Sequence, residues 1–294
     1  MDLGIYILSY NRLQDLKFVT DRLLRLKEGG VKEIVILDQG SDDGSIHFLE
    51  KLSLSGINVI FSERNMGVAG GRHCLLSNSQ ADLCLFLDDD SYLFDDYIDR
   101  IIQEFVQDNE LDFLSLNVID KEGNLRDWPH ARSLKKRWEE SWRAMNFVGC
   151  GHVIKRDSYF NVGGYSTSGM FYAEELDLVY KFFAYRKGIS GKYCGDIKVV
   201  HLASEKSRIH WSGLRLVYRV KNRLTYYFDS FTLLSPLTWA FVTGYFLSDL
   251  ILALKNKNLH GFIAGLRSVR ISLNSRCSFN LTLKYQILHI KSLL

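Results

Sequence analysis

The sequence predicts an α/β protein built on a doubly wound, mostly parallel sheet flanked by helices. Short apolar runs alternate with segments of helical spacing through the first half of the chain. Polar, glycine-rich segments follow several of these runs, at the strand ends where such sheets place their ligand sites. The 294 residues hold only two prolines and show no internal repeat, so one or two ordinary globular domains are expected.

The N-terminal elements follow one another in regular order. Apolar residues 3–8 predict the first strand, and apolar positions 16, 19, 23 and 26 have the spacing of a helix that Gly29-Gly30 ends. The remaining expected elements are strands at 33–37, 58–62 and 83–87, a helix at 46–52 and a helix that begins at Gly70-Gly71-Arg72. No G-x-G-x-x-G follows the first strand, which excludes a dinucleotide-binding fingerprint there.

The strand at 83–87 runs directly into three carboxylates, Asp88-Asp89-Asp90. Adjacent carboxylates repel one another and are tolerated together mainly when a cation or strong donors lie among them. Asp38 ends an earlier strand, so the two acidic segments can face one crevice at the edge of the sheet. The alternative is a solvated acidic turn that caps the next helix.

An ordered set of motifs carries a family resemblance. Its members are Tyr10-Asn11, Asp38 with the run Ser41-Asp42-Asp43-Gly44-Ser45, Arg64-Asn65-x-Gly67, Gly70-Gly71-Arg72 and Leu87-Asp88-Asp89-Asp90. In this order and spacing the set resembles family-2 glycosyltransferases of the GT-A fold. It is most similar to bacterial rhamnosyltransferase-like members that build surface polysaccharides, over roughly the first two-thirds to three-quarters of the chain.

The resemblance implies a nucleotide-sugar site. Tyr10 would stack on the base, Asp38 would accept the imide N–H of uracil or thymine, and Arg64 would bind the base or the diphosphate. Further donor-binding residues implied in this way are Asn11, Arg12, Asn65, Gly67, Arg72, Asp88 and Asp89.

The acidic triplet matches the D-x-D motif of that family. The resemblance implies Mn²⁺ or Mg²⁺ held by Asp90, with Asp88 on the ribose or a metal-bound water. His201 ends an apolar strand at a position where the family has a metal or diphosphate ligand, and Asp89 is expected to be structural.

The acceptor side is expected later in the chain. Glu174, Glu175 and Asp177 stand at the start of a predicted helix, where the helix dipole also stabilises carboxylates. The resemblance implies Glu175 as the catalytic base, although which of Glu174 and Glu175 acts stays open, and Asp177 is expected to orient the site. Acceptor contacts are expected at Trp128, Trp138, Gly149, Cys150 and Gly151. For the tryptophan-bearing segment 120–146, a solvated lid without specific contacts is the alternative.

The C-terminal third differs in charge from the rest. Residues 1–205 carry 32 acidic against 24 basic side chains, whereas 206–294 carry 13 basic against two acidic ones. We therefore expect a catalytic domain at 1–205 and a basic, apolar helical region at 206–294 that lies on an anionic membrane rather than on nucleic acid. A helical subdomain packed on the sheet or in a homodimer is the alternative. The apolar stretch 233–254 is long enough to span a bilayer, but an interfacial helix is favoured.

The function expected is that of an inverting, metal-dependent glycosyltransferase. It would move a sugar from dTDP-rhamnose or a UDP-sugar to a lipid-linked or growing polysaccharide acceptor. The five cysteines form no C-x-x-C pair and no secretory signal precedes the first strand, so a cytoplasmic location at the inner face of the membrane is expected. A sugar nucleotidyltransferase and a non-catalytic membrane-associated scaffold remain alternatives.

Overall fold

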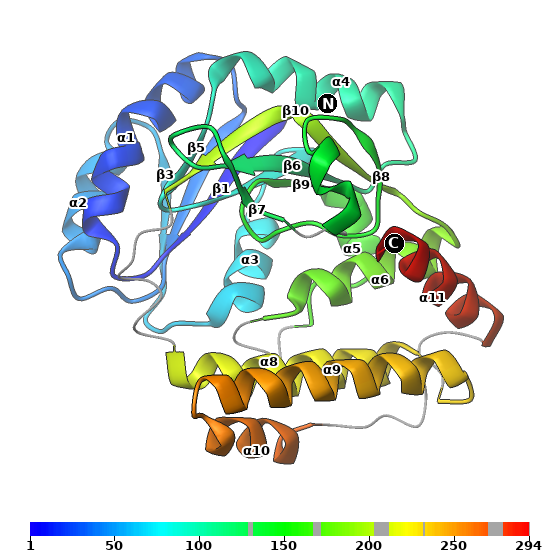
Figure 1. Ribbon diagram of the computed structural model, residues 1–294. Coiled ribbons are helices and arrows are strands. Elements are labelled where there is room, and N and C mark those ends of the chain that lie inside the picture. Colours follow the sequence, from blue (N-terminus) through cyan, green and yellow to red (C-terminus); the bar gives the residue numbers. More distant parts are fainter. Residues whose placement is uncertain (129–131, 167–171, 203–211, 232, 270–278, 294) are drawn as a thin grey trace.

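The computed structural model describes residues 1–128, 132–166, 172–202, 212–231, 233–269 and 279–293 (Figure 1). Within these ranges the strands form one ten-stranded sheet in the order β3-β2-β1-β4-β9-β6-β10-β5, with β7 beside β6 and β8 beside β10. The strands are β1 Leu3–Ser9, β2 Glu33–Asp38, β3 Asn58–Phe61, β4 Leu83–Asp88, β5 Ser91–Leu93, β6 Phe113–Ile119, β7 Leu125–Asp127, β8 Trp142–Ala144, β9 His152–Lys155 and β10 Gly191–His201.

Helices cover both faces of this sheet (Figure 1). They are α1 Leu13–Glu28, α2 Ser45–Ser53, α3 Gly67–Ser77, α4 Ile98–Gln107, α5 Arg156–Asn161 and α6 Glu174–Arg186, with single 3₁₀ turns at Asp95–Tyr97 and Arg132–Arg137. The predicted strands and helices of the first ninety residues are therefore confirmed to within a few positions.

Six strands of the described sheet run in one direction: β1, β2, β3 and β4, and, beyond the antiparallel β9, β6 and β10. Their carboxyl ends consequently meet at one edge. The predicted α/β class with a mostly parallel sheet is confirmed, and β5, β7, β8 and β9 are the antiparallel additions that make the sheet mixed.

The strand β1 shows why these runs form the centre of the sheet. Ile5 and Ile7 pack into the apolar cluster on one face, and Tyr6 packs into the cluster on the other. A strand that is buried on both faces reads as a continuous apolar run, because neither set of alternating side chains meets water. Its register pairs Leu8 with Asp88 and Ser9 with Asp38, which brings the polar strand ends to one edge.

The strand β10 brings a distant part of the chain to the same edge. It pairs in parallel with β6 and in antiparallel fashion with the short β5, and the last of these pairs joins His201 to Ser91. Ser91 follows the acidic triplet directly. The imidazole of His201 is therefore carried to the carboxylates by strand pairing.

Four helices follow: α8 Ser212–Ser230, α9 Pro236–Lys255, α10 Leu259–Arg267 and α11 Phe279–Leu293. The helix α8 packs on α6 as well as on α9 and α10, and these three C-terminal helices lie together below the sheet in Figure 1. The predicted helical extension is confirmed, whereas the expected domain boundary at 205/206 lies outside the described residues. In the described part of the chain α9 is long and apolar enough to cross a membrane by length and composition.

Candidate active site

A cavity of about 650 Å³ opens at the carboxyl edge of the sheet. Its wall combines the end of β1, the start of α3, the acidic turn after β4, the segment 146–150, the first turn of α6, the end of β10 and Arg215 of α8. Thirteen of the residues expected at the site line it: Tyr10, Arg12, Asn65, Gly67, Arg72, Asp88, Asp89, Asp90, Gly149, Cys150, Glu174, Glu175 and His201. The fold thus gathers donor-side and acceptor-side candidates in one chamber.

The acidic turn is neutralised by a buried guanidinium. Nη2 of Arg12 lies 2.5 Å from Oδ2 of Asp90, and Nε lies 3.2 Å from Oδ1 of Asp89 and 2.9 Å from Asp15. Burial raises the pKa of the Asp89 carboxyl well above its usual value, and the Asp90 charge adds to this, although Arg12 opposes it. Arg12, expected as a donor ligand, is therefore also the cation that holds the triplet together.

A second positive group comes from β10. Nε2 of His201 lies 3.2 Å from Oδ1 of Asp90 and 3.6 Å from Oδ2 of Asp88, and its Nδ1 lies 2.6 Å from Oδ2 of Asp127. Burial by itself would lower the pKa of His201, but the bonds to Asp127 and Asp90 outweigh it and raise the pKa to about 10. The imidazole is thus held between three carboxylates.

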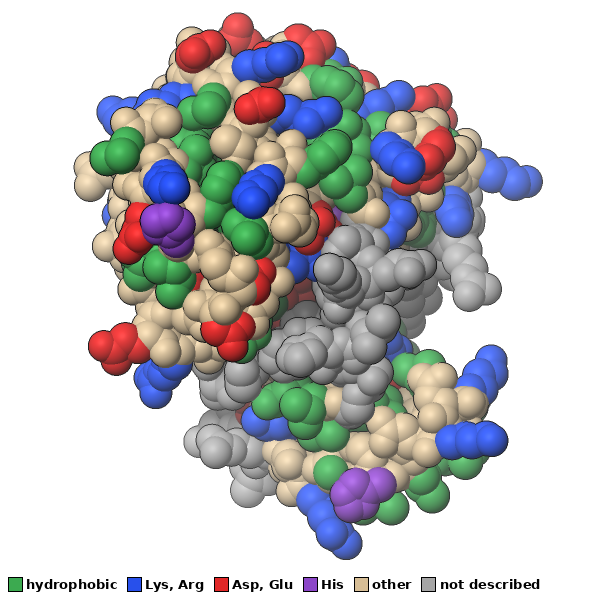
Figure 2. Space-filling view, turned by 90° about the vertical axis from the view of Figure 1, so that its left-hand side faces the viewer, with side chains coloured by type: hydrophobic (Ala, Val, Ile, Leu, Met, Phe, Trp, Pro, Cys, Tyr) green, Lys and Arg blue, Asp and Glu red, His purple; other side chains and the backbone are tan. Residues whose placement is uncertain are grey.

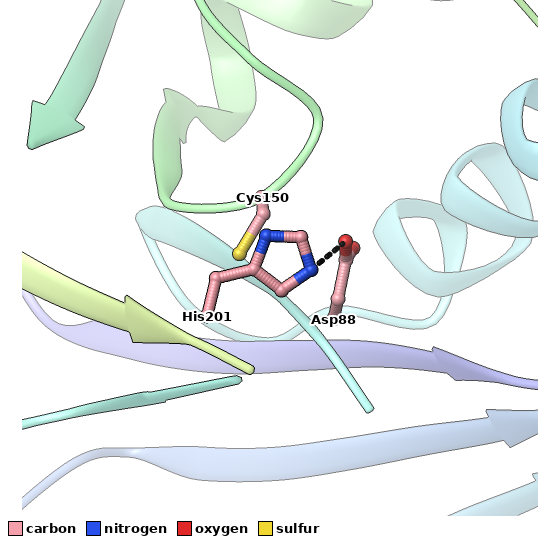
Figure 3. A group of neighbouring side chains, drawn as sticks. All are labelled: Asp88, Cys150 and His201. Atoms are coloured by element: carbon pink, nitrogen blue, oxygen red, sulfur yellow. Dashed lines mark ion pairs between the residues drawn. The ribbon is translucent and has the colours of Figure 1, made fainter. Parts of the chain in front are cut away.

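The donor set at this point fits a divalent cation. Figure 3 shows the Asp88 carboxylate pointing at the His201 ring, with the Cys150 thiol on the other side of that ring. One ligand atom from each of these three residues lies within 4.8 Å of the others. Carboxylate oxygen and imidazole nitrogen suit Mn²⁺, and the carboxylates suit Mg²⁺. The expected metal residues Asp88, Asp90 and His201 are therefore brought together.

Cys150 lies beside these residues rather than on the acceptor side, where it was expected. Its thiol is close to Asp88 and His201, and burial raises its pKa well above the usual value. Gly149 does face the acidic pair, because a Cβ built there would meet Oε1 of Glu175 at 3.0 Å and Nη2 of Arg72 at 2.7 Å. A glycine at this position leaves room for those two side chains.

Glu174 and Glu175 line the same cavity and lie around the buried Arg72. Its Nη1 is 3.4 Å from Oε1 of Glu174 and 3.5 Å from Oε1 of Glu175, while Nη2 donates to the carbonyl of Gly149 at 2.8 Å. Burial and the adjacent Glu175 raise the pKa of Glu174 to about 8. The side chain of Glu175 is 19% exposed against 6% for Glu174, so Glu175 is the more accessible carboxylate.

Two residues that were expected to bind the base, Asp38 and Arg64, do not line the cavity. Asp38 is fully buried, accepts from the backbone N–H groups of Gly40 and Ser41 and from the Ser41 hydroxyl, and does not line the cavity. Arg64 is exposed and also lies off the cavity. A carboxylate at the end of a strand can accept hydrogen bonds from the turn that follows it. The Asp38 carboxylate does so and is therefore not directed to a ligand. Gln39, the next residue, lines the cavity instead.

Asn11 and Asp177 make structural contacts near the cavity rather than lining it. Asn11, with φ of 56°, donates its backbone N–H to the Ser41 hydroxyl, and its side-chain Oδ1 accepts from the N–H of Asp42; these bonds join the loops after β1 and β2. Asp177 is buried, pairs with Lys181 at 2.7 Å and accepts from the N–H of Ser166 at 3.1 Å. Neither side chain lines the cavity.

Three expected acceptor residues also lie outside the cavity wall. Trp128 packs edge-on against Trp142 and Tyr193, because its large ring completes an apolar cluster. Trp138 is fixed by its carbonyl, which accepts from Tyr193 at 2.6 Å. A Cβ at Gly151 would meet β6 and β10 side chains, so this glycine serves strand packing. These placements correct the expectation that the tryptophans form an acceptor platform.

Among the cavity residues that were not anticipated from the sequence are Asp127, Tyr172 and Arg215. Asp127 was hidden in a segment expected to be irregular, and it comes to the site because β7 pairs with β6. Tyr172 and Arg215 flank stretches with no local pattern that marks a site. Their positions depend on how α6 and α8 pack, and spacing along the sequence does not encode that.

The fold and the cavity define an α/β protein with a carboxylate-lined ligand site at the carboxyl edge of its sheet. The family model for glycosyl transferase family 2 matches residues 5–188, and the chain belongs to this family. An uncharacterised glycosyltransferase, YfnE of Bacillus subtilis, is 25% identical over 174 residues, which are 58% of this chain and 42% of that protein. A cholesterol galactosyltransferase of Borreliella burgdorferi is 30% identical over 96 residues, covering 30% of this chain and 27% of that protein. The match thus spans less than half of either relative.

Solved structures agree on the fold. TarS of S. aureus, residues 1–349 in complex with UDP-GlcNAc, superposes with a TM-score of 0.61 at 16% identity, over 90% of this chain and 80% of that one. A Pyrobaculum calidifontis mannosyltransferase in complex with GDP-Man and Mn²⁺ gives 0.60 at 14% identity, over 90% and 73%. The expectation of a family-2 protein with a GT-A fold is therefore confirmed.

Proposed function

We propose that this chain is an inverting glycosyltransferase that moves a sugar from a nucleoside-diphosphate donor to an acceptor hydroxyl. One observation carries the proposal: a single cavity is lined both by a carboxylate–imidazole cluster, Asp88, Asp90 and His201, and by the glutamate pair Glu174 and Glu175. A leaving diphosphate needs positive charge on one side of the reacting carbon and a base on the other. The family membership supports this assignment.

The residues divide between two tasks. On the donor side Tyr10 would stack on the base, and Asp88, Asp90 and His201 would hold Mn²⁺ or Mg²⁺, which supplies positive charge to the departing diphosphate. On the acceptor side Glu175 would take the proton from the attacking hydroxyl, because it is the more exposed of the two glutamates. Glu174, with a pKa of about 8, stays largely protonated at neutral pH and is the poorer base.

A single displacement at the anomeric carbon would give inversion. The oxygen of the acceptor forms the new glycosidic bond as the bond to the diphosphate breaks, and Glu175 receives the proton of that hydroxyl. We propose dTDP-rhamnose or a UDP-sugar as donor and a lipid-linked or growing polysaccharide as acceptor, following the resemblance of the motif set.

The C-terminal helices support a membrane-bound acceptor. The outer face of α9 exposes large apolar side chains, and α10 continues that surface: Trp239, Phe246, Leu247, Ile251, Leu254, Leu259 and Ile263. Figure 2 shows hydrophobic side chains together with Lys and Arg on this lower part of the molecule. Apolar side chains bordered by basic ones suit the surface of an anionic bilayer. We propose that α9 lies on the cytoplasmic face of the membrane, while a homodimer is the competing use of this face.

The experiment that tests the function is a donor screen followed by product analysis. The full chain is incubated with Mn²⁺, anionic vesicles and a panel of dTDP-rhamnose, UDP-GlcNAc, UDP-glucose and GDP-mannose, and release of nucleoside diphosphate is measured. Release from one donor, lost on chelation, supports the proposal. Release of pyrophosphate would indicate nucleotidyl transfer, and absence of binding to every donor by calorimetry would indicate a scaffold.

A further inference from the structure

The first turn of α6 is preceded by two residues in an unfavourable backbone conformation. Tyr172 has φ of 82° and Ala173 has φ of 69°, and neither is a glycine. Residues with a Cβ avoid this left-handed region, so it persists only where surrounding contacts impose it. Glu174 and Glu175 follow at once, so the path of these two residues sets where both carboxylates point.

The contacts that impose this conformation come from α8. Nδ2 of the buried Asn222 donates to the carbonyl oxygen of Tyr172 at 3.1 Å. Nη1 of Arg219 donates to the Tyr172 hydroxyl at 2.5 Å, and its guanidinium lies over the tyrosine ring at 5.1 Å from the centroid. The backbone and the side chain of Tyr172 are thus held from one helix face, since positions 219 and 222 are three residues apart.

Arg219 is itself fixed from α9. Its Nε lies 2.7 Å from Oδ1 of the fully buried Asp249, and the same oxygen accepts from Arg223. A buried carboxylate needs such partners, because an unpaired charge in the interior is costly. Contacts therefore run without a break from α9 through Arg219 to Tyr172 and the start of α6.

We propose that Arg219 and Asn222 are positioning residues for the transfer reaction. They hold Tyr172 and Ala173 in the left-handed region, and this conformation aims Glu174 and Glu175 at Arg72 and into the cavity. Asp249 keeps Arg219 in place and so links the membrane-facing helix to the acidic pair. The expected effect on kcat rests on the proposed function. The expected effect on the conformation of residues 172–175 rests only on the contacts described above.

A matched pair of variants separates positioning from folding. Arg219→Gln and Arg223→Gln each remove one guanidinium from Asp249, but only Arg219 also touches Tyr172. Both variants should lose thermal stability to a similar extent. Amide hydrogen exchange measured by mass spectrometry should rise about tenfold or more at residues 173–177 in Arg219→Gln and stay near the wild-type rate there in Arg223→Gln. Equal exchange in the two variants would overturn the proposal.

Steady-state kinetics then tests the consequence for the reaction. The donor used is the one of the panel from which the wild-type chain releases nucleoside diphosphate fastest. Arg219→Gln and Asn222→Ala should lower kcat by about tenfold or more and leave the donor KM within about twofold, whereas Arg223→Gln should keep the wild-type kcat. Arg219→Lys should recover part of the loss. An unchanged kcat in Arg219→Gln, or a loss confined to KM, would count against the positioning role.

A double-mutant cycle identifies the bond concerned. Tyr172→Phe removes the hydroxyl that Arg219 reaches, so the double variant should be about as slow as Arg219→Gln alone. Additive losses would show that Arg219 acts through another group. If the wild-type chain releases nucleoside diphosphate from none of the donors, the proposed function fails. The amide hydrogen exchange measurement still decides whether α8 holds the start of α6.

Discussion

Nε2 of His201, at the end of β10, lies 3.2 Å from Oδ1 of Asp90, in the turn after β4, although these two segments are far apart in the sequence. The other oxygen of Asp90 is bonded to Arg12 at 2.5 Å. Asp90 is therefore shared between two cationic side chains, and a divalent cation would compete with both for the same carboxylate. The affinity for the cation should therefore depend on Asp90 and on both of its cationic partners.

The cation should depend on Asp90 and His201. Asp90→Asn and His201→Gln should each weaken Mn²⁺ binding by about tenfold or more, since each removes one ligand atom. Titration of Mn²⁺ in the presence of UDP, followed by electron paramagnetic resonance, measures the affinity. Asp42→Asn is the control, because Asp42 is exposed near the same edge and does not line the cavity. Unchanged affinity in Asp90→Asn would contradict the assignment.

Substitution of Glu175, the proposed catalytic base, should lower kcat far more than substitution of Glu174. Glu175→Gln should lower kcat by about 100-fold or more while donor binding stays near the wild-type level, because the carboxylate acts on the acceptor and not on the nucleotide. Glu174→Gln should cost much less, since Gln resembles the protonated form that a pKa of about 8 favours. Steady-state kinetics with binding by calorimetry gives both quantities. The reverse order of effects would make Glu174 the base.

Stability should fall with rising pH because of Glu174. Its pKa is about 8 in the folded protein against 4.5 for the ordinary group, so the folded state binds this proton more tightly. The corresponding stabilisation is complete below pH 4.5 and is lost as pH rises through 8. The melting temperature of Glu174→Gln should therefore decline less than that of the wild type between these limits. Parallel pH profiles would show that Glu174 does not carry this dependence.

Arg12 should stabilise the protein through the acidic turn. Arg12→Met leaves the buried Asp89 and Asp90 without their guanidinium, and loss of one partner of a buried pair costs about 3 kcal/mol. Added Mn²⁺ should raise the melting temperature more in this variant than in the wild type, because the cation then replaces the lost charge. Arg25→Met, on the helix α1 that follows Arg12, is the control, since Arg25 is exposed. An equal response to Mn²⁺ in both proteins would refute this reading.

The outer face of α9 should bind anionic vesicles. Leu247 and Ile251 are 50% and 53% exposed, and the double variant Leu247→Glu/Ile251→Glu should lose most co-sedimentation with phosphatidylglycerol vesicles. Binding by the wild type should also weaken as salt is added. Leu54→Glu is the matched control, because Leu54 is 88% exposed and lies at the end of α2. A change from dimer to monomer without loss of vesicle binding would favour a homodimer.

The sequence predicted those parts of the site that depend on single strands. The apolar runs that end in Asp88 and His201 are legible locally, and the parallel arrangement places both ends at one edge. It did not predict Asp127, whose position depends on the irregular pairing of β7 with β6. Asp38 was assigned to a ligand, although its carboxylate orders the turn that follows it.

The tryptophans illustrate a second limit of sequence reasoning. Trp128 and Trp138 are expected from the sequence to contact the acceptor, but pattern alone does not distinguish an exposed ring from one that fills an apolar cluster, as the ring of Trp128 does. The left-handed Tyr172 and Ala173 were equally hidden, since neither residue type signals positive φ. Tertiary contacts decide both cases.

The buried Asp249 bears on how the chain can be shortened. The family match ends at residue 188, so removal of α9 and the helices after it would be an obvious way to seek a soluble catalytic unit. Such a cut before α9 would leave Arg219 and Arg223 without the carboxylate that binds them. The shorter protein would gain solubility while losing support for the residues before α6. We therefore expect the smallest active unit of this chain to extend well beyond residues 5–188, which match the family.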